Sequence, residues 1–348
     1  MKNNKFKKCI FLVILSFSGL FFPSCQEEEP VLFPPTLITF EATEITAKSA
    51  SSGGNITDDG GTPIIARGLV WSHSANPTLE QNEGITSQNA GTGTFASKLA
   101  NLLPKTTYYV KAYATNSAGT VYGNEIMFET LEGLTDIDGN VYNTVTIGTQ
   151  VWMAENLKTT RYSNGDPIGT TQPVSLNITE EDLPKYHWPA GGNEGNVALY
   201  GRLYTWHVVN DSRNVCPAGW HVPSETEWTT MENYLVAGGF NFDNTSSGNK
   251  IAKALASASG WAGSTTAGAV GNNDFPEKRN ATGFTALPAG MRYSSGNFDY
   301  MGIYAYWRSS GDVDETSAWS HYLFYDSSSS QRIVFGKKAA FSIRCVKN

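Results

Sequence analysis

Apolar and polar residues alternate along much of the chain between residues 36 and 131. A period of two is typical of β-strands that bury one face. The clearest strands are expected at 64–71 and 108–114, with a last strand at 123–130. Clusters of Ser, Asp, Asn and Gly predict turns at 51–54, 58–61 and 116–119. The pattern therefore predicts an all-β sandwich over residues 36–131.

Residues 134–348 mix helical and strand patterns. Ser224 followed by Glu227 forms a capping box, which starts a helix. The apolar residues behind it share one helical stripe, so we expect a helix at 225–236. A second helix is expected at 250–255, and β segments at 305–309, 319–325 and 342–346. This second domain is predicted to be α+β.

The N-terminal residues 1–24 form a targeting segment. Four lysines precede an apolar stretch, residues 9–22, that is short for a membrane span. Ser24-Cys25 resembles a lipobox, so Cys25 is the expected lipidation site; an ordinary secretory signal is the alternative. Residues 25–35 are expected to form an acidic, Pro-rich tether, either a surface-export tag or a plain linker.

Composition narrows the class of protein. Hydrophobic residues make up 40% of the chain, enough for a sizeable core, so the chain is not disordered. The formal net charge is -7, and basic residues cluster only at the N-terminus. Nucleic acid is therefore excluded as an expected partner.

Cysteine usage predicts a disulfide. Of the four cysteines, Cys9 lies in the signal and Cys25 at the lipid site, which leaves Cys216 and Cys345 for an oxidising compartment. We expect these two to pair; a reactive cysteine is the alternative, although no Cys-His-Asn motif surrounds either.

Catalytic and metal-binding motifs are missing from the sequence. The five histidines lack zinc-ligand spacing, and no nucleophile elbow, Walker loop or dinucleotide fingerprint occurs. Asp136 to Asn140 could form half a calcium loop, but a tight turn between two strands is the better interpretation. We therefore expect no metal, no cofactor and no catalytic residues.

Aromatic residues suggest carbohydrate binding, because aromatic faces stack on sugar rings. Trp152, Trp206, Trp220 and Trp228 lie within apolar patterns and are expected in the core. Other residues beside polar or Gly-rich stretches are candidates for ligand binding: Trp188, Trp261, Asn272, Asn273, Asp274, Tyr300 and Trp319. The site is expected in the loops at 260–274 and around Tyr300, without the usual calcium-dependent sugar motifs.

Leu102, Pro104 and Tyr108 resemble the E–F corner of a fibronectin type III domain, in which a tyrosine hydroxyl ties the loop to the strand. This resemblance covers residues 36–131 and implies a fibronectin III-like sandwich, a fold more often a spacer or binding module than an enzyme.

The second domain, 134–348, resembles the Fibrobacter-type major paralogous domain (FISUMP). The resemblance rests on the following groups: Asp138–Asn140 with Val151–Leu157, Tyr200–Trp206, Cys216–Ser224 with Glu227–Trp228, Gly283–Gly290 and Ser342–Lys347. It implies a surface or secreted bacterial protein, often a lipoprotein. The order of these groups also resembles the C-type-lectin-like fold and its relative, the formylglycine-generating-enzyme fold.

The resulting hypothesis is a non-catalytic lipoprotein, lipid-anchored and surface-exposed on the outer membrane. It would display a lectin-like domain for adhesion or for binding polysaccharide or protein. The alternatives are an enzyme on a formylglycine-generating-like fold and a structural outer-membrane component.

Overall fold

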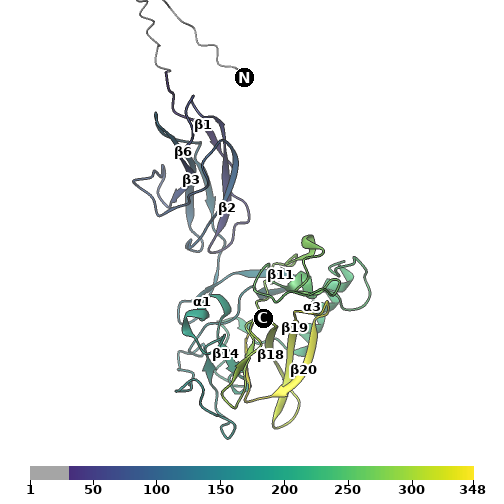
Figure 1. Ribbon diagram of the computed structural model, residues 1–348. Coiled ribbons are helices and arrows are strands. Elements are labelled where there is room, and N and C mark those ends of the chain that lie inside the picture. Colours follow the sequence, from purple (N-terminus) through teal and green to yellow (C-terminus); the bar gives the residue numbers. More distant parts are fainter. Residues whose placement is uncertain (1–30) are drawn as a thin grey trace, which may run out of the picture. The chain divides into compact units, whose positions relative to one another are not determined.

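The computed structural model describes residues 31–348 and divides into two compact units, the first ending at Leu131 and the second beginning at Glu132 (Figure 1). Most of the chain's regular structure is β. The predicted signal segment, Cys25 and the acidic stretch lie outside the described residues. Among residues 31–348, no helix is both long and apolar enough to cross a membrane.

Residues 31–131 of the first unit form eight strands in two antiparallel sheets, of order β1-β2-β5 and β4-β3-β6-β7, with β8 also paired to β6. The strands are β1 (Thr36–Thr39), β2 (Ala50–Asp58), β3 (Ala66–Ser72), β4 (Gly84–Ile85), β5 (Gly93–Leu99), β6 (Thr107–Asn116), β7 (Gly119–Tyr122) and β8 (Ile126–Glu129). Alternate residues of both sheets, such as Ile56, Leu69 and Val110, form one buried core. The predicted all-β sandwich is therefore present.

The tyrosine corner of this sandwich is confirmed. The Leu103 backbone N–H donates a hydrogen bond of 3.0 Å to the hydroxyl of the buried Tyr108. This bond holds the loop before β6 against the strand that the loop leads into.

The turn expected at 51–54 is wrong, because these residues lie inside β2 and pair with β5. The glycines serve close packing instead. A Cβ on Gly53 would lie 2.1 Å from the Phe95 carbonyl oxygen, and one on Gly54 would lie 2.7 Å from the Ala112 Cβ. Glycine within a strand marks such close approaches as well as turns.

The second unit holds the remaining elements. Its strands are β9 (Leu134–Thr135), β10 (Val141–Tyr142), β11 (Thr144–Ile147), β12 (Gln150–Met153), β13 (Tyr186–His187), β14 (Leu203–Thr205), β15 (Trp220–His221), β16 (Met291–Arg292), β17 (Phe298–Asp299), β18 (Tyr304–Asp312), β19 (Ser317–Phe324), β20 (Gln331–Gly336), β21 (Ala340–Phe341) and β22 (Val346–Lys347). Its helices are η1 (Glu194–Asn196), α1 (Val197–Tyr200), α2 (Trp206–Val209), α3 (Glu225–Ala237), α4 (Ala252–Leu255) and η2 (Pro276–Lys278).

Three larger sheets organise this unit, of order β11-β12-β22-β15, β13-β14-β21-β16-β17 and β18-β19-β20; β9 and β10 form a separate hairpin. The predicted strand at 342–346 is wrong as a single element. The chain pairs with β14 and β16 through β21, and then with β12 and β15 through β22. The residues between these strands pass from one sheet to the other, so they cannot continue either ladder.

Helix α3 begins as predicted. The Ser224 side chain accepts a hydrogen bond from the Glu227 N–H, and the Glu227 carboxylate accepts one of 2.8 Å from the Ser224 N–H. The same carboxylate lies 2.7 Å from Nε2 of His221. The other ring nitrogen of His221, Nδ1, lies 2.7 Å from Asn348 Oδ1. The capping box is thus linked to the C-terminal residue.

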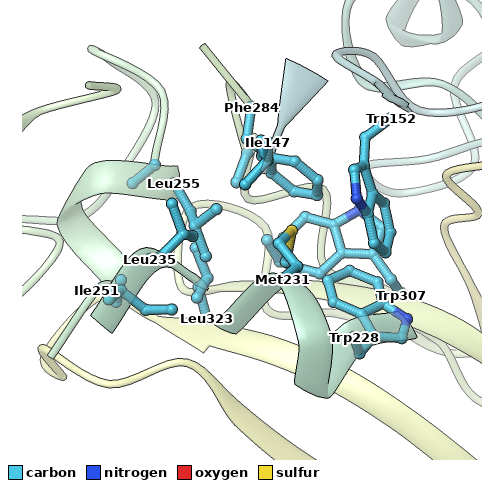
Figure 2. Packing of buried hydrophobic residues seen from close by; sticks show 14 of the residues in the cluster. Ile147, Trp152, Trp228, Met231, Leu235, Ile251, Leu255, Phe284, Trp307 and Leu323 are labelled. Carbon is cyan, nitrogen blue, oxygen red and sulfur yellow. The ribbon is translucent and has the colours of Figure 1, made fainter. Parts of the chain in front are cut away.

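The largest core packs around Trp228 of α3 (Figure 2). The Trp228 ring centroid lies 4.9 Å from that of Trp152, 5.9 Å from that of Trp307 and 6.1 Å from that of Phe284. Trp152, Trp206, Trp220 and Trp228 are all buried, as expected from their apolar surroundings.

The Cys216–Cys345 disulfide is confirmed, with an S–S distance of 2.00 Å and a Cα–Cα distance of 6.0 Å. Both residues are fully buried. The bond joins the loop before β15 to the segment before β22, and so connects residues 129 positions apart.

Three buried arginines hold loops in place by donating hydrogen bonds to the backbone carbonyls of those loops. Arg292 donates to Val174 and Leu176, Arg308 to Gly336 and Ala339, and Arg344 to Phe284 and Thr285. Arg308 and Arg344 are fully buried, and burial lowers the pKa of each to about 9. Backbone carbonyl dipoles therefore compensate much of the buried charge, while Glu181 acts electrostatically on Arg292 and Glu155 on Arg344.

Candidate functional site

An aromatic surface lies on one face of the β18-β19 pair. Tyr304 and Tyr306 lie two positions apart on β18. The register places Tyr304 opposite Phe324 and Tyr306 opposite Tyr322 of β19. Successive side chains of a strand point to opposite faces, so these four share one face. Tyr306 is buried, whereas Tyr304, Tyr322 and Phe324 are partly exposed.

The rings on this face contact one another. The Tyr304 centroid lies 4.6 Å from that of Phe324 and 5.0 Å from that of Tyr306, in stacked geometry. Tyr322 lies 5.8 Å from Tyr304 and 5.6 Å from Tyr306. Buried Tyr306 stacks on Phe341 of β21. This contact anchors the aromatic cluster to the sheet that contains β21.

Two tyrosines from the β16-β17 region extend the surface. Tyr300 lies edge-on to Tyr304 at 5.2 Å, and its hydroxyl lies 3.2 Å from that of Tyr293. That hydrogen bond raises the pKa of Tyr293 to about 12, and burial raises the pKa of Tyr304 and Tyr322. These three phenols are therefore neutral near pH 7. The Tyr293 hydroxyl donates to Tyr300 and the Tyr322 hydroxyl to Gln331 Oε1, whereas the Tyr304 hydroxyl can donate to a ligand. We define Tyr293, Tyr300, Tyr304, Tyr322 and Phe324 as the aromatic face.

A hollow of about 410 Å³ adjoins this face, and Tyr300 belongs to both. Its lining is largely apolar: Ala190, Gly191, Met291, Phe298, Met301 and Ile303, with Asp299 and Tyr300. Asp299 is the only charged residue among them. Gly290 sits beneath this region at φ +67°, where an added Cβ would lie 2.2 Å from the Asp299 carbonyl oxygen. The chain can therefore approach itself closely enough to shape the hollow only with glycine there.

The structure separates the predicted tryptophans from this site. Trp188 is buried at 8% exposure, so the expectation of an exposed ring is wrong; its ring packs edge-on against Tyr186. Trp261 is partly buried against the large core and donates to Ser257 Oγ. Trp319 is partly exposed, with the Arg332 guanidinium 4.7 Å above its ring.

The predicted residues 272–274 are largely engaged within the protein. The Asp274 carboxylate pairs with the buried Lys253 ammonium and accepts a hydrogen bond from the Gly268 N–H. The Asn272 amide donates to the Thr266 carbonyl, whereas Asn273 is exposed. Across residues 31–348, no group of three or more His, Cys, Asp or Glu residues could hold a metal ion. Among the predicted candidates, Tyr300 alone belongs to the aromatic face.

Sequence reasoning missed Tyr293, Tyr304, Tyr322, Phe324 and Asp299. A signal for three of them was present: Tyr304-Ala-Tyr306 and Tyr322-Leu-Phe324 each place two aromatic residues two positions apart. In strands, such residues share a face. Their assembly also depends on the β18-β19 register, which pairs the two strands across a turn.

A charged cluster lies on the other face of β19. His321 is almost fully buried and stacks on Trp228, with ring centroids 4.5 Å apart. Its Nε2 lies 3.2 Å from Glu225 Oε1, and its Nδ1 lies 3.8 Å from Glu232 Oε1. Arg332 NH1 lies 3.6 Å from Glu225 Oε2. Burial lowers the pKa of His321, but the two carboxylates outweigh it, so the net pKa is raised.

This raised pKa predicts a pH-dependent stability. A group that binds its proton more tightly when folded stabilises the fold fully below its unfolded pKa of about 6.5, and this contribution is lost as pH rises through the folded pKa. The free energy of unfolding should therefore fall as pH rises above about 6.5, and more steeply than in His321→Gln, which cannot carry the charge. Urea unfolding of both proteins at several pH values measures this. Parallel pH curves would contradict the prediction.

Comparison with known proteins gives one family match. The model of the Fibrobacter succinogenes major domain family matches residues 145–347. No curated protein matches the chain.

Several solved structures match part of the chain. The sensor domain of the anti-sigma factor RsgI4 in Pseudobacteroides cellulosolvens, in its shorter form, is 22% identical, over 29% of this chain and 99% of that chain, with a TM-score of 0.23. The fibronectin type III domain of human fibronectin type III domain containing protein 3 is 20% identical, over 30% of this chain and 91% of that chain, with a TM-score of 0.21.

Proposed function

The chain belongs to the Fibrobacter succinogenes major domain family through residues 145–347, and on this premise we propose that it is a non-catalytic extracellular protein that binds polysaccharide. The aromatic face is the observation that carries the proposal. It presents ring surfaces that are only partly covered, and buried Tyr306 on the same face packs them against Phe341 of β21. Rings held in place before binding lose little conformational freedom when a ligand stacks on them.

The chemistry of the face matches that of a sugar chain. Sugar rings carry apolar C–H faces and hydroxyl edges, and tyrosine offers a ring surface with a hydroxyl at its tip. The neutral Tyr304 hydroxyl can donate as well as accept hydrogen bonds, whereas Tyr293 donates to Tyr300 and can only accept from a ligand. The adjoining hollow offers a place for one unit of the chain.

The rest of the molecule supports display at a surface. In this proposal Cys25 is lipidated, residues 25–35 form a tether to the outer membrane, and the first unit acts as a spacer. We also propose that the second unit is a divergent C-type-lectin-like domain. The capped start of α3 and the disulfide to the last segment correspond to that outline.

The enzyme alternative has no free thiol among the described residues, because Cys216 and Cys345 are joined to each other. The first test is therefore binding. The full-length protein is screened by affinity gel electrophoresis and on a glycan array, with host-matrix proteins as a separate panel. A screen in which no glycan is retained would reject polysaccharide binding.

Replacing Tyr304 tests the site. Tyr304→Ala removes the ring at the centre of the face, and we expect it to weaken polysaccharide binding about tenfold or more. Tyr234→Ala is the matched control, since Tyr234 is an exposed tyrosine on α3, 49% accessible and outside the aromatic face. Thermal unfolding checks that both variants are folded. Unchanged affinity of a folded Tyr304→Ala variant would reject this site.

A further inference from the structure

The charge distribution of the hollow points to a narrower class of ligand. Its walls are formed by apolar or aromatic side chains, and Asp299 supplies the one charged group in its lining. Polar and apolar atoms share the exposed lining about equally, and the one charged group among them sets the charge preference of what the hollow binds.

The Asp299 carboxylate is available to a ligand. The residue is exposed, and its Oδ1 accepts one hydrogen bond of 2.8 Å, from the Tyr300 backbone N–H. Within residues 31–348, no Lys, Arg or His nitrogen lies within 4.0 Å of it, whereas other surface carboxylates such as Glu181 and Asp243 are paired. A carboxylate that accepts only one backbone N–H hydrogen bond retains lone pairs for a cationic donor.

The nearest buried cation does not satisfy this carboxylate. Arg292 lies next to it on the β16-β17 hairpin, with its guanidinium 5.7 Å from the Phe298 ring centroid. That guanidinium is fully buried and donates to the carbonyls of Val174, Leu176 and Tyr293. Arg292 therefore supports the floor of the site and leaves the exposed charge negative.

We propose that the hollow binds an amino-sugar unit, with its ammonium on Asp299 and its ring against Tyr300 and Phe298. This inference rests on the proposed function, because the aromatic face is taken to hold the adjoining units of the same chain. Charge complementarity decides the occupant: a carboxylated sugar unit would place two negative charges together, and a neutral unit would leave Asp299 without a counter-charge.

Three oligosaccharides of equal length test the proposal. The β-1,4-linked hexamers of glucosamine, N-acetylglucosamine and glucose share one backbone and differ at C2, where they carry an ammonium, an acetamide or a hydroxyl. Titration calorimetry with the full-length protein, at a pH where the amines are protonated, should show the glucosamine hexamer binding about tenfold tighter than the other two.

Asp299→Asn separates this contact from general attraction between a polycation and an acidic protein. Asn keeps the oxygen that accepts from Tyr300 but loses the charge, so the preference for the glucosamine hexamer should fall to about twofold or less. Glu277→Gln removes one charge at an exposed position on η2, away from the hollow, and should keep the preference.

The outcomes distinguish the two proposals. Equal binding of the three hexamers, or a preference that Asp299→Asn does not reduce, overturns the amino-sugar assignment while polysaccharide binding stands. Absence of binding to all three hexamers and to the wider glycan panel overturns both.

Discussion

Replacing Cys216 and Cys345 together by alanine should lower the free energy of unfolding of the second unit by about 2–5 kcal/mol. The disulfide closes a loop of 129 residues, and a long closed loop restricts the unfolded chain strongly. The bond also ties the loop before β15 to the segment that leads into β22, and β22 pairs directly with β15. Breaking the disulfide therefore also removes a constraint on β15 and β22 in the folded protein.

Urea unfolding followed by tryptophan fluorescence measures this effect. The unaltered protein unfolded with a reductant present is the matched control, because it loses the bond without losing side-chain volume. Its unfolding midpoint should move in the same direction as that of the double variant. A double variant as stable as the oxidised protein would show that packing alone holds the two segments together.

Trp228→Ala should destabilise the same unit by about 3–5 kcal/mol. The side chain is 1% exposed and packs against Trp152, Phe284, Trp307 and His321, so its loss leaves a cavity between α3 and the sheets. Such cavities are costly because the close-packed neighbours relax only in part.

Trp319→Ala is the control for Trp228→Ala. Trp319 is partly exposed, and the guanidinium of the exposed Arg332 lies over its ring, so its removal should cost about 1 kcal/mol or less. Equal losses from the two substitutions, measured by urea unfolding, would contradict the assignment of Trp228 to the core.

The features predicted well from sequence were those set by nearby residues. The capping box at Ser224 and Glu227 fixes the start of α3 through contacts three positions apart. The tyrosine corner at Tyr108 acts across five positions. The disulfide was also predictable, because the number of cysteines left few choices. Gly53 and Gly54 misled the prediction, since the same residue type serves both turns and close packing.

The candidate site was harder to predict, because it depends on contacts between distant segments. Tyr300 was identified from its loop, but its partners come from β18, β19 and the hairpin of β16 and β17. Periodicity places Tyr304 and Tyr306 on one face without saying whether that face is covered. Trp188 illustrates the converse: a Gly-rich turn follows it in the sequence, and yet the fold buries it.

The arginine-held loops have a consequence for how this family can diversify. Arg292, Arg308 and Arg344 each bind backbone carbonyls, which every amino acid possesses. The bonds from these arginines to the loops at 174–176, 284–285 and 336–339 therefore do not depend on which side chains the loops carry. The exposed side chains at 175–176 can vary by mutation while their loop keeps its shape, whereas Phe284 and Ala339 are buried in the cores. The same buried arginine can thus support a different surface at 175–176, as a scaffold supports a grafted loop.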